Sequence, residues 1–161
     1  MNLNLKKIKE MIEENRFNIR VYGILINEKN ELLLVHEKFG DVEIIKFPGG
    51  GLEFGEGTKE CIIREFKEET EIDIEVAEHF YTTDFFQQSA FRKTDQIISI
   101  YYTVKALQDS SKINLNEFDL NLGKRIERLR FFWIPLSELN ENAVTLPIDK
   151  VVCKMITSKL H

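Results

Sequence analysis

The stretch from residue 48 to residue 72, PGGGLEFGEGTKECIIREFKEETEI, constrains the fold more than any other part of the chain. Three consecutive glycines lead into a segment in which Ile62 and Phe66 lie four residues apart, and this spacing predicts an amphipathic helix over Thr58–Thr70. Thr58 is the expected N-cap, because its hydroxyl can accept a hydrogen bond from a free N–H of the first turn. The glycines permit close backbone approach and positive φ, so that carbonyls or amides can face a ligand.

The predicted helix presents three carboxylates, Glu65, Glu68 and Glu69, within an arc of roughly 80°. Like charges at these spacings destabilise a helix by about 0.2–0.5 kcal/mol per pair, so a bound partner is expected to offset them. A divalent cation such as Mg²⁺ is one such partner, since it prefers oxygen ligands. The alternative is an ordinary solvated acidic face, in which Arg64 pairs with Glu60 and Glu68 at i±4.

The spacing of the whole stretch helps to choose between these alternatives. From Gly50 it runs over five residues to Glu56, seven more to the pair Arg64–Glu65, an apolar residue, any residue, and then Glu68–Glu69. Six fixed residues at about 7% each, over about 140 windows, would arise by chance with a probability on the order of 10⁻⁵. The pattern resembles the signature box of the Nudix hydrolases, which cleave nucleoside diphosphates linked to another group.

The resemblance implies a fold, a domain and a metal site. The fold is an α/β/α sandwich with a mixed sheet, and the domain is a single Nudix hydrolase domain over residues 1–161 with its box at 48–72. The cofactor is Mg²⁺, with Mn²⁺ as the alternative. The implied metal ligands are Glu65, Glu68, Glu69 and the backbone carbonyl of Gly50.

The resemblance also implies supporting roles within the box. Glu56 and Arg64 are expected to hold the loop and the helix together by ion pairing, and Glu65 is a candidate base. The one departure is Glu71, which stands where the family usually has glycine. A residue with a Cβ adopts the left-handed conformation of a helix terminus at a cost of about 1 kcal/mol, so this helix end is the least certain part of the match.

Composition narrows the class of protein. With 161 residues the chain is long enough to bury one core, and 43% hydrophobic with 30% charged residues is typical of a soluble globular protein. The net charge of −5 disfavours a broad nucleic-acid-binding surface. Cys61 and Cys153 are too few and too far apart for a disulfide framework or a zinc site. The charged N-terminal stretch and the lack of an 18-residue apolar run predict a cytoplasmic protein without a membrane partner.

The rest of the chain predicts strands interleaved with helices. An amphipathic helix is expected over Leu3–Asn15, within a helical extension of residues 1–16 that either caps the domain or contributes to a homodimer. A polar connection is expected over Gln108–Arg128 and a closing helix over Pro147–Leu160. Strands are predicted at Asn18–Asn27, Glu31–His36, Glu43–Phe47, Ile72–Val76, Phe80–Phe86, Gln96–Leu107 and Arg130–Ile134. This order of elements predicts a mixed sheet covered on both faces.

A further catalytic carboxylate is expected from a loop outside the box, as the resemblance implies. Glu127, six residues before Trp133, is the candidate, and Glu117 and Asp119 compete for the role. The alternative is an exposed loop acid.

Substrate contacts are expected from aromatic and basic residues. Phe85 and Phe91 can stack on a base, and Arg20 and Arg92 can meet phosphates. The competing basic residues are Lys38, Lys124 and Arg125.

The sequence thus predicts a metal-dependent pyrophosphohydrolase. It would cleave the diphosphate bond of a nucleoside diphosphate linked to another group, or of a nucleoside triphosphate, by attack of water at phosphorus. One alternative is a nucleotide-binding or regulatory domain that has lost catalysis, against which the intact glutamates argue. Another is an RNA 5′-end hydrolase, which would need a basic groove that the net charge disfavours.

Overall fold

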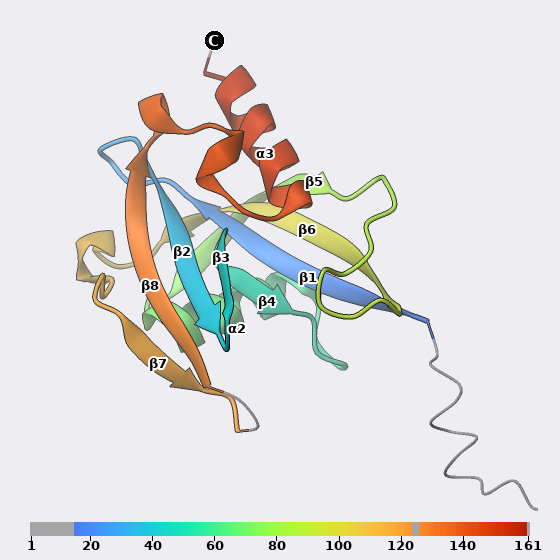
Figure 1. Ribbon diagram of the computed structural model, residues 1–161. Coiled ribbons are helices and arrows are strands. Elements are labelled where there is room, and N and C mark those ends of the chain that lie inside the picture. The colour runs from blue at the N-terminus through green and yellow to red at the C-terminus, as the bar shows by residue number, and fades with distance from the viewer. Residues whose placement is uncertain (1–14, 124–125, 161) are drawn as a thin grey trace, which may run out of the picture.

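Two four-stranded sheets and two α-helices form the part of the fold that the computed structural model describes, residues 15–123 and 126–160 (Figure 1). The strand orders are β4-β1-β6-β5 and β3-β2-β8-β7. The strands are β1 Arg16–Leu25, β2 Glu31–Phe39, β3 Val42–Lys46, β4 Gly49–Gly51, β5 Ile74–Thr82, β6 Asp95–Ala106, β7 Phe118–Asn121 and β8 Ile126–Pro135. The helices are α2 Thr58–Thr70 and α3 Pro147–Ser158, and short 3₁₀ turns lie at Ser110–Lys112, Leu136–Glu138 and Glu141–Ala143.

The first sheet is mixed and the second is antiparallel. β1 runs parallel to β6, whereas β4 and β5 pair antiparallel with their neighbours. In the second sheet every described pair is antiparallel, with β2 between β3 and β8. The mixed α/β sandwich that the sequence predicts is confirmed.

Both faces of the central strands are covered, which explains why their sequences are apolar almost throughout. On β1 and β2, Val21 and Leu33 belong to the core that contains Phe66 of α2. Their chain neighbours Tyr22 and Leu34 belong to a second core, formed with α3. The two helices therefore pack on opposite sides of the strands (Figure 1).

Helix α2 has the predicted bounds, but its N-cap prediction is wrong. Gly57 is the N-cap, and its N–H donates to Oε2 of Glu60 at 2.7 Å. Thr58 is the first helical residue, and its hydroxyl lies 2.7 Å from the Tyr102 hydroxyl. The helix captures Glu60 for its first turn, which leaves the Thr58 side chain free to contact the sheet.

The C-terminus of α2 lies where the sequence raised doubt. Glu71 takes the left-handed conformation with φ of 61°, and its N–H donates to the Lys67 carbonyl at 3.0 Å. The helix therefore ends as a glycine would end it, at the cost in backbone strain that a Cβ brings.

Two strand predictions are wrong. Ile72–Val76 and Phe80–Phe86 are not two strands but one, β5, which ends at Thr82. Its register shifts between Val76 and Glu78 and again between His79 and Tyr81, and these bulges disturb the alternation by which a strand is recognised.

The connection Gln108–Arg128 is not a plain loop. It contains a 3₁₀ turn, the short strand β7 and the start of β8. The first residues of β8 alternate between outward and inward side chains, but Glu127 is one of the inward ones, so the pattern looks like a polar loop.

The predicted helix Leu3–Asn15 falls almost entirely outside the described residues, and Arg16 already belongs to β1. Within the described ranges no helix is long and apolar enough to cross a membrane.

Candidate functional site

The glycine turn and helix α2 meet at Gly50. A Cβ added to Gly50 would overlap the carboxylate of Glu65, so only glycine lets the backbone approach this side chain. Gly49 has φ of 143°, and a Cβ there would overlap the carbonyl oxygen of Val21. The three glycines of the box thus serve a close approach between a backbone turn and a carboxylate.

Arg64 ties the loop to the helix. Its guanidinium makes a bidentate ion pair with Glu56, with Nε–Oε2 at 2.9 Å and Nη2–Oε1 at 2.6 Å. It also donates to the Gly51 carbonyl at 3.2 Å and, through Nη1, to Glu65 at 3.0 Å and Glu68 at 3.3 Å. The Arg64 hydrogen bonds hold the pKa of the Glu56 carboxyl down at about 2. Arg64 therefore fixes the positions of three carboxylates around one guanidinium.

Glu65, Glu68 and Glu69 differ in their surroundings. Burial raises the pKa of Glu65, even though Arg64 opposes the shift. Glu69 is 8% exposed, its Oε2 has no hydrogen-bond partner among the described residues, and burial raises its pKa to about 8. The Glu68 side chain is 49% exposed. The helix therefore presents one buried, one half-enclosed and one solvated carboxylate.

The second sheet brings two more carboxylates to Glu69. Glu37 on β2 and Glu127 on β8 are both buried, and both raise the pKa of Glu69 by their negative charge. Glu37 stands opposite Leu129 in the β2–β8 ladder, two residues from Glu127 on the same face. Glu127, predicted as a loop acid, is therefore an inward-facing strand residue.

A metal ion fits this donor set, although the site is not preassembled. In the described ranges no three His, Cys, Asp or Glu side chains lie close enough together, as they stand, to hold an ion. Arg64 draws Glu65 and Glu68 toward itself. A buried carboxylate oxygen without a partner and a cluster of like charges are what a hard dication would satisfy.

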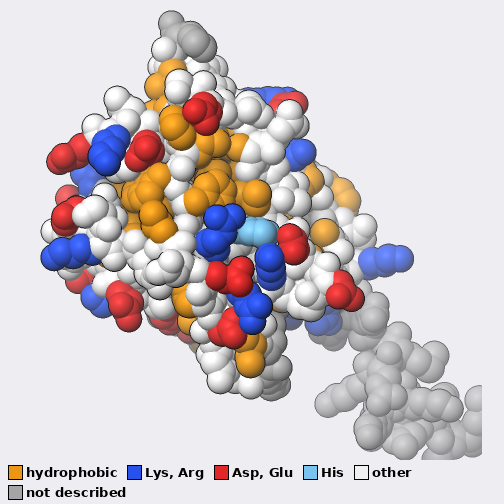
Figure 2. All heavy atoms as spheres, turned by 60° about the vertical axis from the view of Figure 1, so that its left-hand side comes forward, with side chains coloured by type: hydrophobic (Ala, Val, Ile, Leu, Met, Phe, Trp, Pro, Cys, Tyr) orange, Lys and Arg blue, Asp and Glu red, His pale blue; other side chains and the backbone are white. Residues whose placement is uncertain are grey.

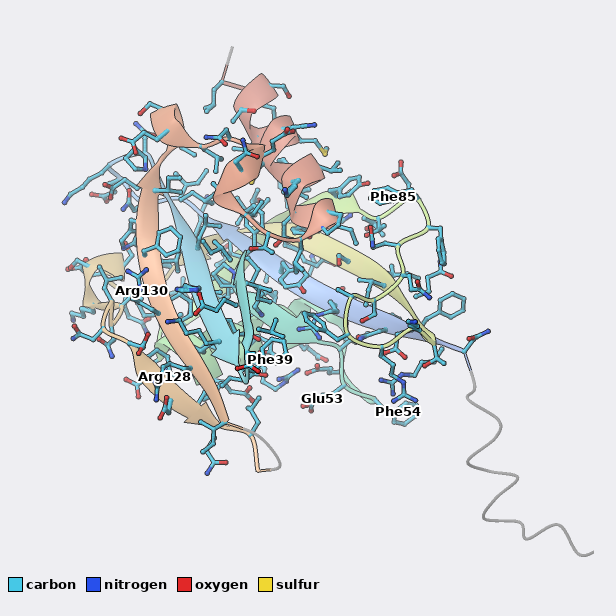
Figure 3. The ribbon with its side chains drawn as sticks, in the orientation of Figure 1. Phe39, Glu53, Phe54, Phe85, Arg128 and Arg130 are labelled. Carbon is cyan, nitrogen blue, oxygen red and sulfur yellow. The ribbon has the colours of Figure 1, made fainter. Side chains whose placement is uncertain are left out.

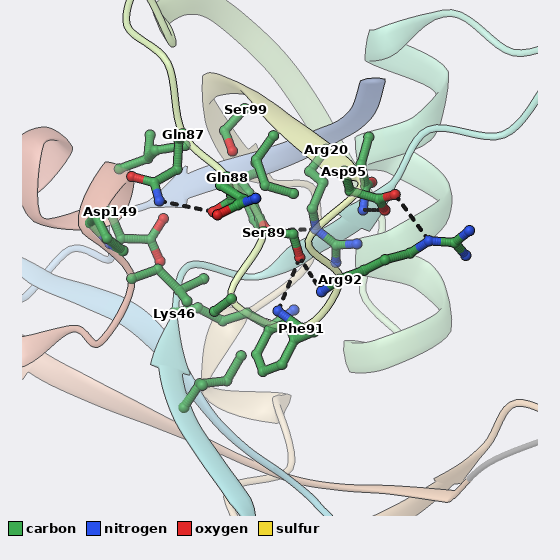
Figure 4. Close-up of a pocket in the computed structure, with 18 of the residues that line it drawn as sticks. Arg20, Lys46, Gln87, Gln88, Ser89, Phe91, Arg92, Asp95, Ser99 and Asp149 are labelled. Atoms are coloured by element: carbon green, nitrogen blue, oxygen red, sulfur yellow. Dashed lines mark hydrogen bonds and ion pairs between the residues drawn. The ribbon is translucent and has the colours of Figure 1, made fainter. Parts of the chain in front are cut away.

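A cavity of about 530 Å³ lies beside these carboxylates (Figure 4). β1 and β6 form one wall, β2 and β3 the other, and the loop 87–92 and the first turn of α3 complete it. Arg20 and Lys46 bring positive charge to its wall, and Asp149 lies at its α3 end.

The predicted substrate residues fall into two groups. Arg20, Phe91 and Arg92 line the cavity, whereas Phe85 does not and lies on the loop after β5 (Figure 3). Phe91 packs edge-on against Phe39 with ring centroids 5.1 Å apart. Arg92 lies 3.3 Å from Asp95, so its charge is already shared.

Arg20 is the more available cation. Its Nε donates to the Tyr22 hydroxyl at 2.8 Å, and it makes no ion pair with a carboxylate of the described residues. A Cβ on Gly51 would lie 3.7 Å from its Nη1, which places the guanidinium next to the glycine turn.

Comparison with known proteins gives the family. A family model described as the NUDIX domain matches residues 16–155. The chain belongs to the NUDIX family. "Nudix hydrolase 5" of Arabidopsis thaliana is 28% identical over 123 residues, which are 74% of this chain but only 37% of that protein. The NUDIX chain thus spans under two fifths of the length of this relative.

Solved structures show the same fold. A MutT protein from Methanosarcina mazei Go1 superposes with a TM-score of 0.68 at 22% identity, covering 92% of this chain and 98% of that one. A NUDIX hydrolase from Nitrosomonas europaea gives a TM-score of 0.65 at 19% identity, covering 89% and 90%.

The NUDIX site includes residues that the sequence pattern did not single out: Glu37, Lys46 and Asp149. Glu37 and Lys46 are 5% and 3% exposed and form an ion pair at 2.9 Å. Asp149 is 1% exposed, accepts a hydrogen bond from the Tyr101 hydroxyl and leaves Oδ2 without a hydrogen-bond partner in the described structure. A charged residue inside an otherwise apolar strand or helix face is the signal that could have revealed them.

The outer face of the second sheet offers no continuous basic groove in the view of Figure 2, where acidic and basic side chains are interspersed. Lys38 lies 3.4 Å from Glu43, and Arg128 lies 2.8 Å from Asp119 and 3.7 Å from Glu117. On this face Glu117 and Asp119 thus pair with Arg128, on the outward side of β8, while Glu127 faces inward.

Proposed function

We propose that this chain is a metal-dependent hydrolase that cleaves the diphosphate bond of a nucleoside diphosphate linked to another group, or of a nucleoside triphosphate, by attack of water at phosphorus. The observation that carries the proposal is the position of the buried carboxylates, which adjoin a cavity with positive charge in its wall. A diphosphate placed at this junction would meet the metal-binding residues on one side and Arg20 on the other.

Glu65, Glu68, Glu69 and the Gly50 carbonyl would hold Mg²⁺, or Mn²⁺ in its place. Because Arg64 holds two of these carboxylates, metal binding requires them to turn away from the guanidinium. The bound ion supplies a Lewis acid for the phosphoryl oxygens and lowers the pKa of a coordinated water.

The residues of the chain do the rest. Arg64 orients Glu65 and Glu68, and a carboxylate of the cluster, with Glu65 and Glu127 as candidates, accepts the proton of the attacking water. Arg20 binds the phosphate nearer the nucleoside, since it lacks an ion-pair partner in the described structure. Phe91 and Phe39 flank the nucleoside, and Arg92 contributes at the rim. Phe85 lies too far along the loop to line the cavity as it stands, and we assign it no contact.

The test is a hydrolysis assay with Mg²⁺ over nucleoside triphosphates, nucleotide sugars, ADP-ribose and dinucleoside polyphosphates. We expect wild-type turnover on at least one class and a loss of at least about 100-fold in Glu69→Gln. Glu75→Gln is the matched control, because Glu75 is an exposed residue of β5.

The second candidate is a nucleotide-binding domain without catalysis, which would use the same cavity. Binding of nucleotide and metal without turnover across the whole panel would favour it. The cytoplasmic location and the homodimer also stay predictions, to be checked by fractionation and by light scattering.

A further inference from the structure

Lys46 is a buried cation at the junction between the carboxylate cluster and the cavity (Figure 4). It is the last residue of β3, three residues before Gly49. A buried ammonium is costly unless it is paired and hydrogen-bonded. Its Nζ lies 2.9 Å from Oε2 of Glu37, donates to the Gly49 carbonyl at 3.1 Å, and lies 5.7 Å from the centroid of the Tyr22 ring.

The bond to Gly49 acts on the part of the backbone that approaches the carboxylates. The Gly49 carbonyl belongs to the peptide unit that ends in the Gly50 nitrogen, so fixing this carbonyl fixes the plane that enters Gly50. On the other side, the Pro48 carbonyl accepts from the Gly23 N–H at 2.9 Å. Two hydrogen bonds from outside the turn thus set its conformation.

Glu37 sets the direction of Lys46. It is buried on β2, and the ion pair joins the end of β3 to the strand beside it. Burial alone would lower the pKa of Lys46, but the negative charges of Glu37 and Glu69 outweigh it and raise the pKa, so the side chain stays charged.

We propose that Lys46, oriented by Glu37, is a positioning residue for the metal site: it holds the Gly49–Gly50 peptide against Glu65. This inference rests on the proposed metal-dependent function. It assigns Lys46 no contact with the reacting atoms, and it predicts that the turn loses its geometry when the ammonium is removed.

The charge of Lys46 makes this role separable from plain electrostatics. A cation repels a nearby dication, so on charge alone Lys46→Met would tighten metal binding. Positioning predicts the opposite, because the Gly50 carbonyl and Glu65 would no longer be held in register. A purely structural ion pair predicts a loss of stability with metal binding unchanged once the protein is folded.

The experiment measures Mn²⁺ binding to the full chain by electron paramagnetic resonance, with thermal melts of each variant. The variants are Lys46→Met, Lys46→Arg, Glu37→Gln and the double change Glu37→Gln/Lys46→Met. The double variant removes both charges, so it avoids the unpaired buried charge that each single change leaves and keeps the test open if Lys46→Met unfolds.

We expect Lys46→Met to weaken Mn²⁺ binding by about 10- to 100-fold. The double variant should recover thermal stability but not Mn²⁺ affinity, and Lys46→Arg should recover part of the affinity. With a substrate from the hydrolysis panel, kcat should fall more than KM rises. Mn²⁺ binding by the double variant that equals or exceeds that of the wild type would overturn the inference.

The outcomes separate this inference from the function it rests on. A wild-type protein that binds Mn²⁺ and turns over substrate, with a double variant that binds Mn²⁺ equally well, refutes only the role of Lys46. A wild-type protein that neither binds Mn²⁺ nor hydrolyses any substrate refutes both.

Discussion

Glu69 makes the metal-free protein less stable than it could be, so Glu69→Gln should stabilise it. The carboxyl is buried, one of its oxygens has no hydrogen-bond partner among the described residues, and burial together with Glu65, Glu37 and Glu127 raises its pKa from 4.5 to about 8. Glutamine has nearly the same shape and does not ionise. The change therefore removes the cost of burying this acid while keeping the packing of α2.

The size of the effect follows from linkage. Between pH 4.5 and 8 the folded state binds the Glu69 proton and the unfolded state does not, so the free energy of unfolding falls as the pH rises through this window. At pH 7 about 2.5 pKa units of the shift have been felt, which is about 3 kcal/mol at 1.36 kcal/mol per unit. The difference between variant and wild type should be near zero at pH 4 and about 5 kcal/mol at pH 9.

Urea unfolding in EDTA at pH 4, 7 and 9 measures this difference. At pH 7 the variant should melt about 6–12 °C higher than the wild type, at roughly 2–4 °C per kcal/mol for a domain of this size. Glu68→Gln is the matched control, because the Glu68 side chain is half exposed and its loss should change stability little. A Glu69→Gln protein that is no more stable than the wild type at pH 7 without metal would show that Glu69 is not a strained buried acid.

Three further predictions concern positions around the site. Glu71→Gly should stabilise the protein by about 1 kcal/mol, because Glu71 is left-handed at φ 61°, and calorimetry should show this with turnover unchanged. Asp149→Asn should remove a loss of stability of about 3 kcal/mol between pH 4 and 6, since burial raises the pKa of Asp149 from 3.8 to about 6 and stability falls as pH rises through that window; equal slopes in denaturant titrations would contradict it. Arg20→Met should raise KM at least about tenfold and change kcat less, as steady-state kinetics can show; an unchanged KM would remove Arg20 from the substrate site.

The box could be predicted because its parts are local in sequence. The bounds of α2 follow from helical spacing, and the contacts of Arg64 with Glu56 and Glu68 span eight and four residues. The left-handed Glu71 is also a local matter, since it follows from the missing glycine. Short-range patterns of this kind need no knowledge of which strands pair.

The remaining site residues are brought together only by strand pairing. Glu37 reaches Lys46 because β2 and β3 form a ladder, and Asp149 reaches Tyr101 across 48 residues of sequence. In a linear reading each is a single charge in an apolar run. Phe85 went the other way: it was predicted on a strand, but the bulges of β5 end that strand at Thr82.

The charges of the site argue for a bound cation more strongly than the motif alone does. Glu65 has Arg64 and Glu37 has Lys46, whereas Glu69 keeps a buried oxygen without a hydrogen-bond partner in the described structure. An apolar side chain of similar volume would avoid the cost of this group, so stability does not explain its presence. A dication would offset that cost, because it would let Glu69 ionise without leaving an unpaired charge in the interior. Mg²⁺ should therefore stabilise the wild type increasingly from pH 9 down to pH 7, where proton competition with Glu69 begins to oppose it, and should leave Glu69→Gln unchanged in thermal melts.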